Sequence, residues 1–127
     1  MTVPEQWLQK AKYDIETARA MLKAERYEYV LFCCQQAVEK SLKAIIADRT
    51  KKMPPRLHNL IALSDTAGLA VDDVRADVMR ALTDYYIDSR YPEIAGGQEG
   101  GVDRQLAEEF LGKTEGLLRW LTTLMKT

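Results

Sequence analysis

The sequence predicts an all-α protein, an antiparallel up-down bundle of four long helices plus one short cross-helix. Three observations lead to this fold class. Apolar residues recur at three- and four-residue spacings along four long segments. Proline and glycine separate several of these segments. No stretch alternates apolar and polar residues as a half-buried strand would. The length of 127 residues is typical of one domain, so we expect a single domain over residues 1–127.

The first two predicted helices form a hairpin. The first spans residues 4–25, with Thr2 as its N-cap and Pro4 in its first turn, and the second spans residues 28–48. The first apolar face is formed by Trp7, Ala11, Ile15, Ala18 and Leu22, and the second by Leu31, Cys34, Val38, Leu42 and Ile45. Because only a very short connection around Arg26 and Tyr27 separates the helices, they must fold back antiparallel.

Two further helices follow a proline break. Pro54 and Pro55 cannot continue a helix, so a short helix over residues 57–67, ending at Gly68, is predicted after them. The third long helix opens at Asp72 and Asp73 and stops near Arg90. Its inward-facing residues are predicted to be Val74, Val78, Leu82 and either Tyr85 or Tyr86.

The last helix is predicted over residues 103–126, after a flexible loop at residues 96–101 that contains four glycines. One apolar stripe on this helix consists of Leu106, Phe110, Leu117, Leu121 and Leu124. A second stripe, offset by one residue, consists of Leu111, Leu118 and Met125. The second stripe would remain exposed to water in a monomer, which predicts a two-fold homodimer with these three residues in its interface.

Composition excludes several classes of protein. The net charge of −1 gives no overall attraction to nucleic acid, so any such binding must come from a local patch. The adjacent Cys33 and Cys34 fit no zinc or redox spacing and are expected to be buried thiols. No phosphate-binding glycine loop and no Glu-x-x-His motif occurs. We therefore expect no metal and no cofactor.

The chain is expected to be cytoplasmic and not bound to a membrane. Its first residues lack the basic and apolar regions of a signal peptide. No apolar run approaches the length that spans a bilayer.

The strongest local charge pattern is basic. Lys40 and Lys43 share one face of the second helix, and the segment from residue 49 to residue 64 contains no acidic residue. Its cations are Arg49, Lys51, Lys52 and Arg56. Two interpretations remain open, a phosphate-binding surface and a solvated helix end whose cations complement the helix dipole. Glu39 is predicted to pair with Lys43 four residues later.

His58 is the single histidine of the chain. It is either a general base or ligand-facing group, or an imidazole that caps or packs against the short helix. Near the end of the third long helix, Tyr85, Tyr86, Arg90 and Tyr91 form a second cluster. Its aromatic rings can stack on a base while the guanidinium binds a phosphate, or they can fill the end of the bundle while Arg90 pairs with a nearby aspartate.

Three local patterns together resemble the HEPN family. The first is Trp7-x-x-x-Ala11-x-x-Asp14-x-x-x-Ala18. The second is the run from Gln35 to Ala44, QQAVEKSLKA, followed by His58-Asn59-Leu60. The third is the run from Asp84 to Pro92, DYYIDSRYP.

The resemblance implies a helical bundle, commonly dimeric. It also implies a function in RNA cleavage or in a toxin–antitoxin-like pair with a minimal nucleotidyltransferase as partner protein. In RNase members of the family an R-x(4–6)-H motif brings Arg and His together at a dimer cleft. This chain departs from that motif, because no arginine lies at the required distance before His58 and no histidine follows Arg90.

The sequence thus favours a non-catalytic module without catalytic residues that binds a partner, a nucleotide or RNA phosphate. The candidate phosphate-binding residues are Lys40, Lys43, Lys51, Lys52, Arg56, His58, Arg90 and Tyr91. The alternative is a metal-independent RNase with a non-standard site built from Arg90, His58 and tyrosines. A third hypothesis is a purely structural dimer.

Overall fold

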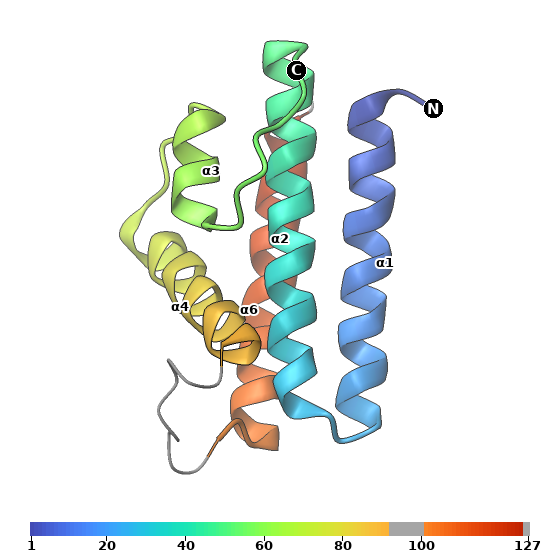
Figure 1. The fold of residues 1–127 in the computed structure, drawn as a ribbon, viewed down its shortest axis with the longest axis vertical. Coiled ribbons are helices and arrows are strands. Elements are labelled where there is room, and N and C mark those ends of the chain that lie inside the picture. Colours follow the sequence, from blue (N-terminus) through green and yellow to red (C-terminus); the bar gives the residue numbers. More distant parts are fainter. Residues whose placement is uncertain (92–100, 126–127) are drawn as a thin grey trace.

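The computed structural model describes residues 1–91 and 101–125, and all regular secondary structure in them is helical (Figure 1). The helices are α1 (Val3–Lys23), α2 (Tyr27–Thr50), α3 (Leu60–Thr66), α4 (Asp73–Arg90) and α6 (Arg104–Thr123). The predicted all-α class is confirmed. The predicted glycine loop falls outside the described residues except for Gly101, and so does the predicted helix end at Lys126.

The four long helices begin and end within a few residues of the predicted positions. The short helix begins at Leu60 and not at Leu57, because Asn59 is extended and caps it. The Asn59 side chain accepts a 3.0 Å hydrogen bond from the backbone amide of Ala62. His58 therefore lies in the segment before the helix and not within it.

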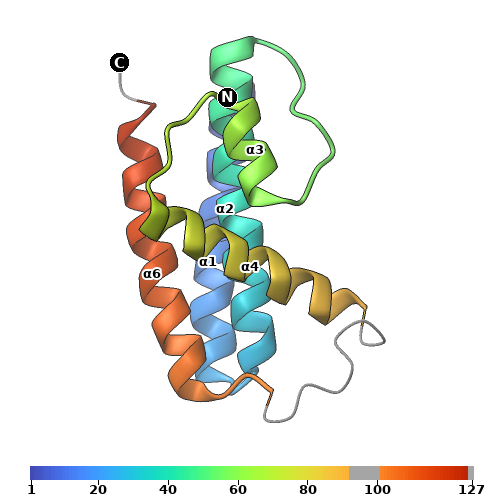
Figure 2. The same ribbon diagram turned by 90° about the vertical axis from the view of Figure 1, so that its left-hand side faces the viewer.

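The arrangement of the helices has one departure from simple up-and-down alternation. Helices α1, α2 and α6 follow the long axis, and α1 is antiparallel to α2 (Figure 1). The departure is helix α4, which crosses α2 obliquely, whereas α6 runs in the same direction as α2, as alternation requires (Figure 2). The end of α4 lies beside the first turns of α2.

Helix α2 is the centre of the core. All five residues of its predicted apolar stripe are buried, and so are residues on its other faces, including Val30, Ala37 and Ile46. The helix contacts α1, α3, α4 and α6. Because partners surround it, four of its polar side chains are buried as well; they are Gln35, Glu39, Ser41 and Lys43. Each of them needs a partner within the protein.

The predicted inward face of α4 is wrong at its start. Val74 is 76% exposed, whereas Ala76, Met79 and Leu82 are buried. Val74 precedes Ala76 by two residues, which places it about 200° around the helix from the buried stripe. At the other end of α4, Tyr86 is the buried member of the tyrosine pair.

The second stripe of α6 is largely covered within the chain. Leu111 is only 7% exposed, while Leu118 and Met125 are half-buried against the core. The expectation that this stripe stays exposed in a single chain is therefore wrong for Leu111. The dimer stays a prediction that rests on Leu118 and Met125. Among the described helices, none combines the length and the apolar character needed to cross a membrane.

Candidate functional site

A buried carboxylate at the middle of α2 organises the candidate site. The Oε1 atom of Glu39 lies 2.8 Å from Nδ1 of His58, and its Oε2 atom accepts a 3.1 Å hydrogen bond from Nζ of Lys43. Gln35 donates from Nε2 to the same Oε1 atom at 3.2 Å. Gln35, Glu39 and Lys43 follow one another at four-residue spacing, so a single face of α2 supplies all three groups.

The same face of α2 fixes the backbone at His58. Nε2 of Gln35 donates a 2.8 Å hydrogen bond to the carbonyl oxygen of His58. Gln36 supports this amide by donating from its own Nε2 to Oε1 of Gln35 at 2.7 Å. Because Gln35 is fully buried, both ends of its amide need such partners. The segment before α3 is thereby held against α2.

Burial and charge determine how His58 is presented. The side chain of Glu39 is 5% exposed and that of Lys43 is 8% exposed, whereas the imidazole of His58 is 51% exposed. A buried carboxylate without a partner would cost several kcal/mol, and Lys43 supplies the compensating charge. Since a carboxylate only accepts, Nδ1 of His58 carries the proton in this contact. In the neutral ring Nε2 is then the nitrogen with a free lone pair.

Helix α4 brings an aromatic ring and a guanidinium to the same place. The ring centroids of His58 and Tyr86 are 5.2 Å apart. Nη1 of Arg90, four residues after Tyr86, donates a 2.7 Å hydrogen bond to the Tyr86 hydroxyl. The guanidinium carbon of Arg90 is 5.5 Å from the centroid of the Tyr86 ring. Tyr86 therefore links the histidine of one segment to the arginine of another.

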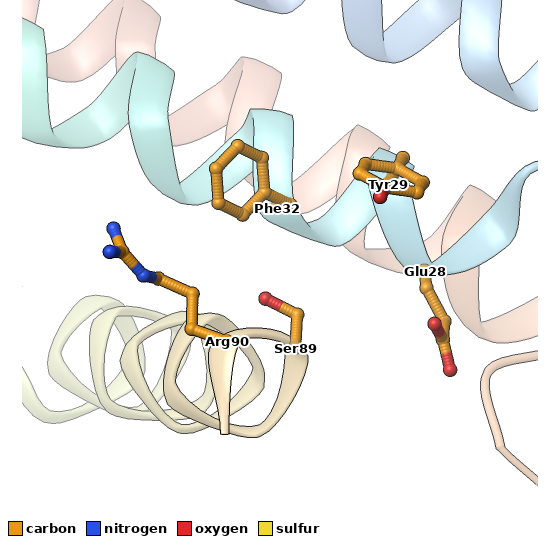
Figure 3. A pocket seen from close by; sticks show the side chains of 5 residues that line it. All are labelled: Glu28, Tyr29, Phe32, Ser89 and Arg90. Atoms are coloured by element: carbon orange, nitrogen blue, oxygen red, sulfur yellow. The ribbon is translucent and has the colours of Figure 1, made fainter. Parts of the chain in front are cut away.

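A small pocket lies beside this cluster, between α2 and α4. Its volume is about 250 Å³. Figure 3 shows Tyr29 and Phe32 extending from α2, and Ser89 and Arg90 extending from α4. Phe32 also stacks on Tyr86, with ring centroids 5.6 Å apart and planes inclined by 19°. The pocket thus combines aromatic surface with a guanidinium group and, at the start of α2, the carboxylate of Glu28.

The structure divides the predicted phosphate-binding residues into separate groups. His58 and Arg90 meet through Tyr86, and Lys43 joins them through Glu39. The ammonium of Lys40 is 2.5 Å from Oδ2 of Asp14 on α1, so it holds two helices together. Tyr91, which follows α4, is 45% exposed. Three other cations line a different groove; they are Lys51, Lys52 and Arg56.

Three residues of the candidate site, Glu39, Gln35 and Phe32, were missed or identified only in part from the sequence. The pairing of Glu39 with Lys43 was predicted and is confirmed. That Glu39 also holds His58, nineteen positions along the chain, has no local signal. Gln35 entered only as the first residue of the second family-like pattern, without a role of its own, and Phe32 gave no functional signal. The four-residue repeat of polar side chains on an otherwise buried α2 is the feature that would have revealed Gln35.

The two cysteines are not part of a reactive site. Burial raises the pKa of Cys33 to about 11 and that of Cys34 to about 12. Both are therefore neutral thiols near neutral pH, and a protonated thiol is a poor nucleophile. The prediction that they are buried, free thiols is confirmed.

Comparison with known proteins gives one family. The HEPN domain model matches residues 4–124. A crystal structure of TT1696 from Thermus thermophilus is similar, with a TM-score of 0.78 and 25% sequence identity over 97% of this chain and 98% of that one. A crystal structure of ST0689, described as an archaeal HEPN homologue, has a TM-score of 0.77 and 25% identity over 99% of this chain and 100% of that one.

Among proteins with curated descriptions no match was found. The family match extends over all but three residues at each end of the sequence, and both structures match over nearly their whole lengths. This chain therefore belongs to the HEPN domain family.

Proposed function

We propose that this chain binds nucleotide or RNA phosphate at the surface formed by His58, Tyr86 and Arg90, without catalysis of its own. One observation carries the proposal: His58 and Arg90 come from separate segments and contact the same tyrosine, Tyr86. An arginine fork is suited to phosphate oxygens, and the exposed imidazole can donate to them from Nε2 when the ring is protonated. The aromatic side chains of the neighbouring pocket supply surface on which a base can stack.

The biological setting is part of the same proposal. Other members of the family are paired with a minimal nucleotidyltransferase, and we propose such a partner protein and a toxin–antitoxin-like role for this chain. A homodimer would present two copies of the His58 and Arg90 surface. The absence of the R-x(4–6)-H motif supports binding over cleavage, because the arginine and the histidine do not stand at the spacing used by RNase members.

The test is the affinity of a fluorescein-labelled single-stranded RNA across a salt series. Binding should weaken as salt rises, because each phosphate contact releases counterions. Arg90→Ala should lower the affinity about tenfold or more at low salt, the effect of losing one hydrogen bond between charged groups. Arg80→Ala is the matched control, because Arg80 lies on the same helix and its side chain forms an exposed ion pair with Asp77. Wild-type affinity in Arg90→Ala would contradict the proposal.

The second candidate function is a metal-independent RNase, and one contact favours it. Glu39 holds Nδ1 of His58 at 2.8 Å, the arrangement in which a carboxylate orients an imidazole as a general base. Arg90 would then stabilise charge on the phosphate. Incubation of the purified protein with labelled RNA separates the two functions. We expect no cleavage above a buffer control. Cleavage that disappears in both His58→Gln and Arg90→Ala, with the helical circular dichroism unchanged, would establish the RNase.

A further inference from the structure

A second concave surface lies away from the His58 and Arg90 cluster. It is a groove of about 700 Å³ between the start of α1, the second half of α2 and the segment that follows α2. Both ribbon views place the beginning of α1 beside the end of α2 (Figures 1 and 2). The volume is in the range of small-molecule sites in proteins. We call this surface the Trp7 groove; its lining residues are Val3, Pro4, Trp7, Lys43, Ala47, Lys51, Lys52, Met53, Pro54, Pro55 and Arg56.

The walls of the Trp7 groove are mainly apolar. Seven of its eleven lining residues are aliphatic, aromatic or proline side chains. Met53 among them is 84% exposed, so its apolar surface is open to a ligand. Trp7 contributes a flat ring and is only partly buried. An apolar body placed in the groove would cover this surface and remove it from water.

All charged side chains that line the groove are cationic. Lys51 forms a 3.8 Å ion pair with Asp48, so its charge is partly compensated. Within the described residues no ion pair holds Lys52 or Arg56. Lys43 lines the groove from inside, with its buried ammonium 5.6 Å from the Trp7 ring centroid. The rim therefore offers two uncompensated positive charges next to apolar walls.

We propose that the Trp7 groove binds a small amphipathic carboxylate, a molecule with one alkyl chain or aryl ring and one carboxylate head. The apolar walls accommodate the body of the ligand, and the guanidinium of Arg56 and the ammonium of Lys52 bind the head. A carboxylate matches the planar fork of arginine in a bidentate geometry. A polyanion such as RNA backbone would use the rim and leave most of the apolar lining uncovered. This site is separate from the one proposed for phosphate.

The experiment uses octanoate as the probe and Trp7 as the reporter. Trp120→Phe leaves Trp7 as the single tryptophan of the chain, so its fluorescence reports on the groove alone. Octanoate should change the emission saturably. Octanol, which lacks the charge, and acetate, which lacks the chain, should each bind at least tenfold more weakly. Inorganic phosphate should not compete with octanoate.

Further variants, made in the Trp120→Phe protein, test the cationic rim and the apolar walls of the Trp7 groove separately. Lys52→Glu combined with Arg56→Glu should lower octanoate affinity at least tenfold, and Met53→Gln should lower it by a smaller factor. Lys23→Glu, at the far end of α1, makes the same type of charge change and should leave affinity unchanged. The proposal is overturned if octanoate gives no saturable change. It is equally overturned if octanol binds as well as octanoate, or if phosphate displaces it.

Discussion

At the scale of single residues, Glu39 joins the core of the protein to its candidate site. Its two carboxylate oxygens contact an exposed histidine and a buried lysine. The charge of Lys43 has been removed from water together with that of Glu39, so neither is tolerated alone. The stability of the core and the orientation of His58 therefore depend on the same residue.

Replacing the Glu39 carboxylate should destabilise the fold strongly. In Glu39→Gln the buried ammonium of Lys43 loses its counter-charge, and we expect a loss of about 3–5 kcal/mol in the free energy of unfolding. Chemical denaturation of the purified variant measures this. Glu109→Gln is the matched control, since Glu109 forms only an exposed 3.9 Å pair with Lys113 and should cost less than about 1 kcal/mol. Adding Lys43→Met to Glu39→Gln should recover part of the loss, and a double variant less stable than Glu39→Gln would contradict this account.

The buried thiols make a prediction about reactivity. Because burial raises the pKa of Cys33 to about 11 and that of Cys34 to about 12, neither should react with a disulfide reagent at pH 8 within the time that an exposed thiol needs. Both should react once the protein is unfolded. Ala70→Cys, at an exposed position, supplies the reacting control. Rapid modification of two thiols in the native wild type would contradict the burial.

The raised pKa values of the two cysteines also predict that the folded protein loses stability at alkaline pH. An unfolded cysteine titrates near pH 8.5, below the pKa of about 11 for Cys33 and about 12 for Cys34 in the fold. As pH rises, the unfolded state therefore releases its thiol protons first. The contribution to stability is full below about pH 8.5 and is lost as pH rises through the two folded-state values. The variant Cys33→Ala with Cys34→Ala should lose less stability over this interval than wild type, which denaturation curves at several pH values can measure.

At the scale of elements, the boundaries of the long helices could be predicted because they follow from local chemistry. Proline, glycine and capping residues act within one helical turn, and they placed the ends of α2 and α4 within two residues. The start of α3 was wrong because Asn59, and not a residue before Leu57, provides the cap. The observed start matters for function, since it leaves His58 before the helix, in the segment that contacts Glu39.

The capping box of α1 gives a prediction at this scale. The Thr2 hydroxyl accepts a 3.2 Å hydrogen bond from the Glu5 amide, and the Glu5 carboxylate accepts one from the Thr2 amide at 2.9 Å. Thr2→Ala should therefore cost about 1 kcal/mol in the free energy of unfolding. Thr17→Ala is the matched control. Its hydroxyl only bonds to the carbonyl of Tyr13 within the helix, so that substitution should be neutral or slightly stabilising. Equal losses in the two variants would contradict the capping argument.

At the scale of the whole molecule, a site built from Arg90, His58 and tyrosines could be suggested from the sequence, but whether these residues meet could not be predicted because they come from separate segments. His58 and Arg90 are each recognisable in the sequence, but only the oblique crossing of α4 over α2 brings Tyr86 between them (Figure 2). An up-and-down bundle would not require this contact. The basic segment after α2 lies beside the start of α1, so Lys52 and Arg56 line a different surface from Arg90.

The dimer is also a property of the whole molecule. Leu118 lies in a groove of about 380 Å³ between α1 and α6, together with Leu8 and Ile15. Since Leu111 is already covered by the chain, this partly apolar groove and the half-buried Met125 are what a second copy would cover. We expect sedimentation at micromolar concentration to show a dimer.

Leu118→Glu should convert that dimer to a monomer, because the carboxylate would have to be buried without a partner in the interface. Val74→Glu is the matched control; Val74 is 76% exposed on α4, outside the α1 and α6 groove, and its substitution should leave the dimer intact. Helical circular dichroism of both variants separates dissociation from unfolding. A wild-type protein that sediments only as a monomer would remove the dimer and assign Leu118 to the stability of one chain. A dimer that persists in Leu118→Glu would place the interface on another face of the bundle.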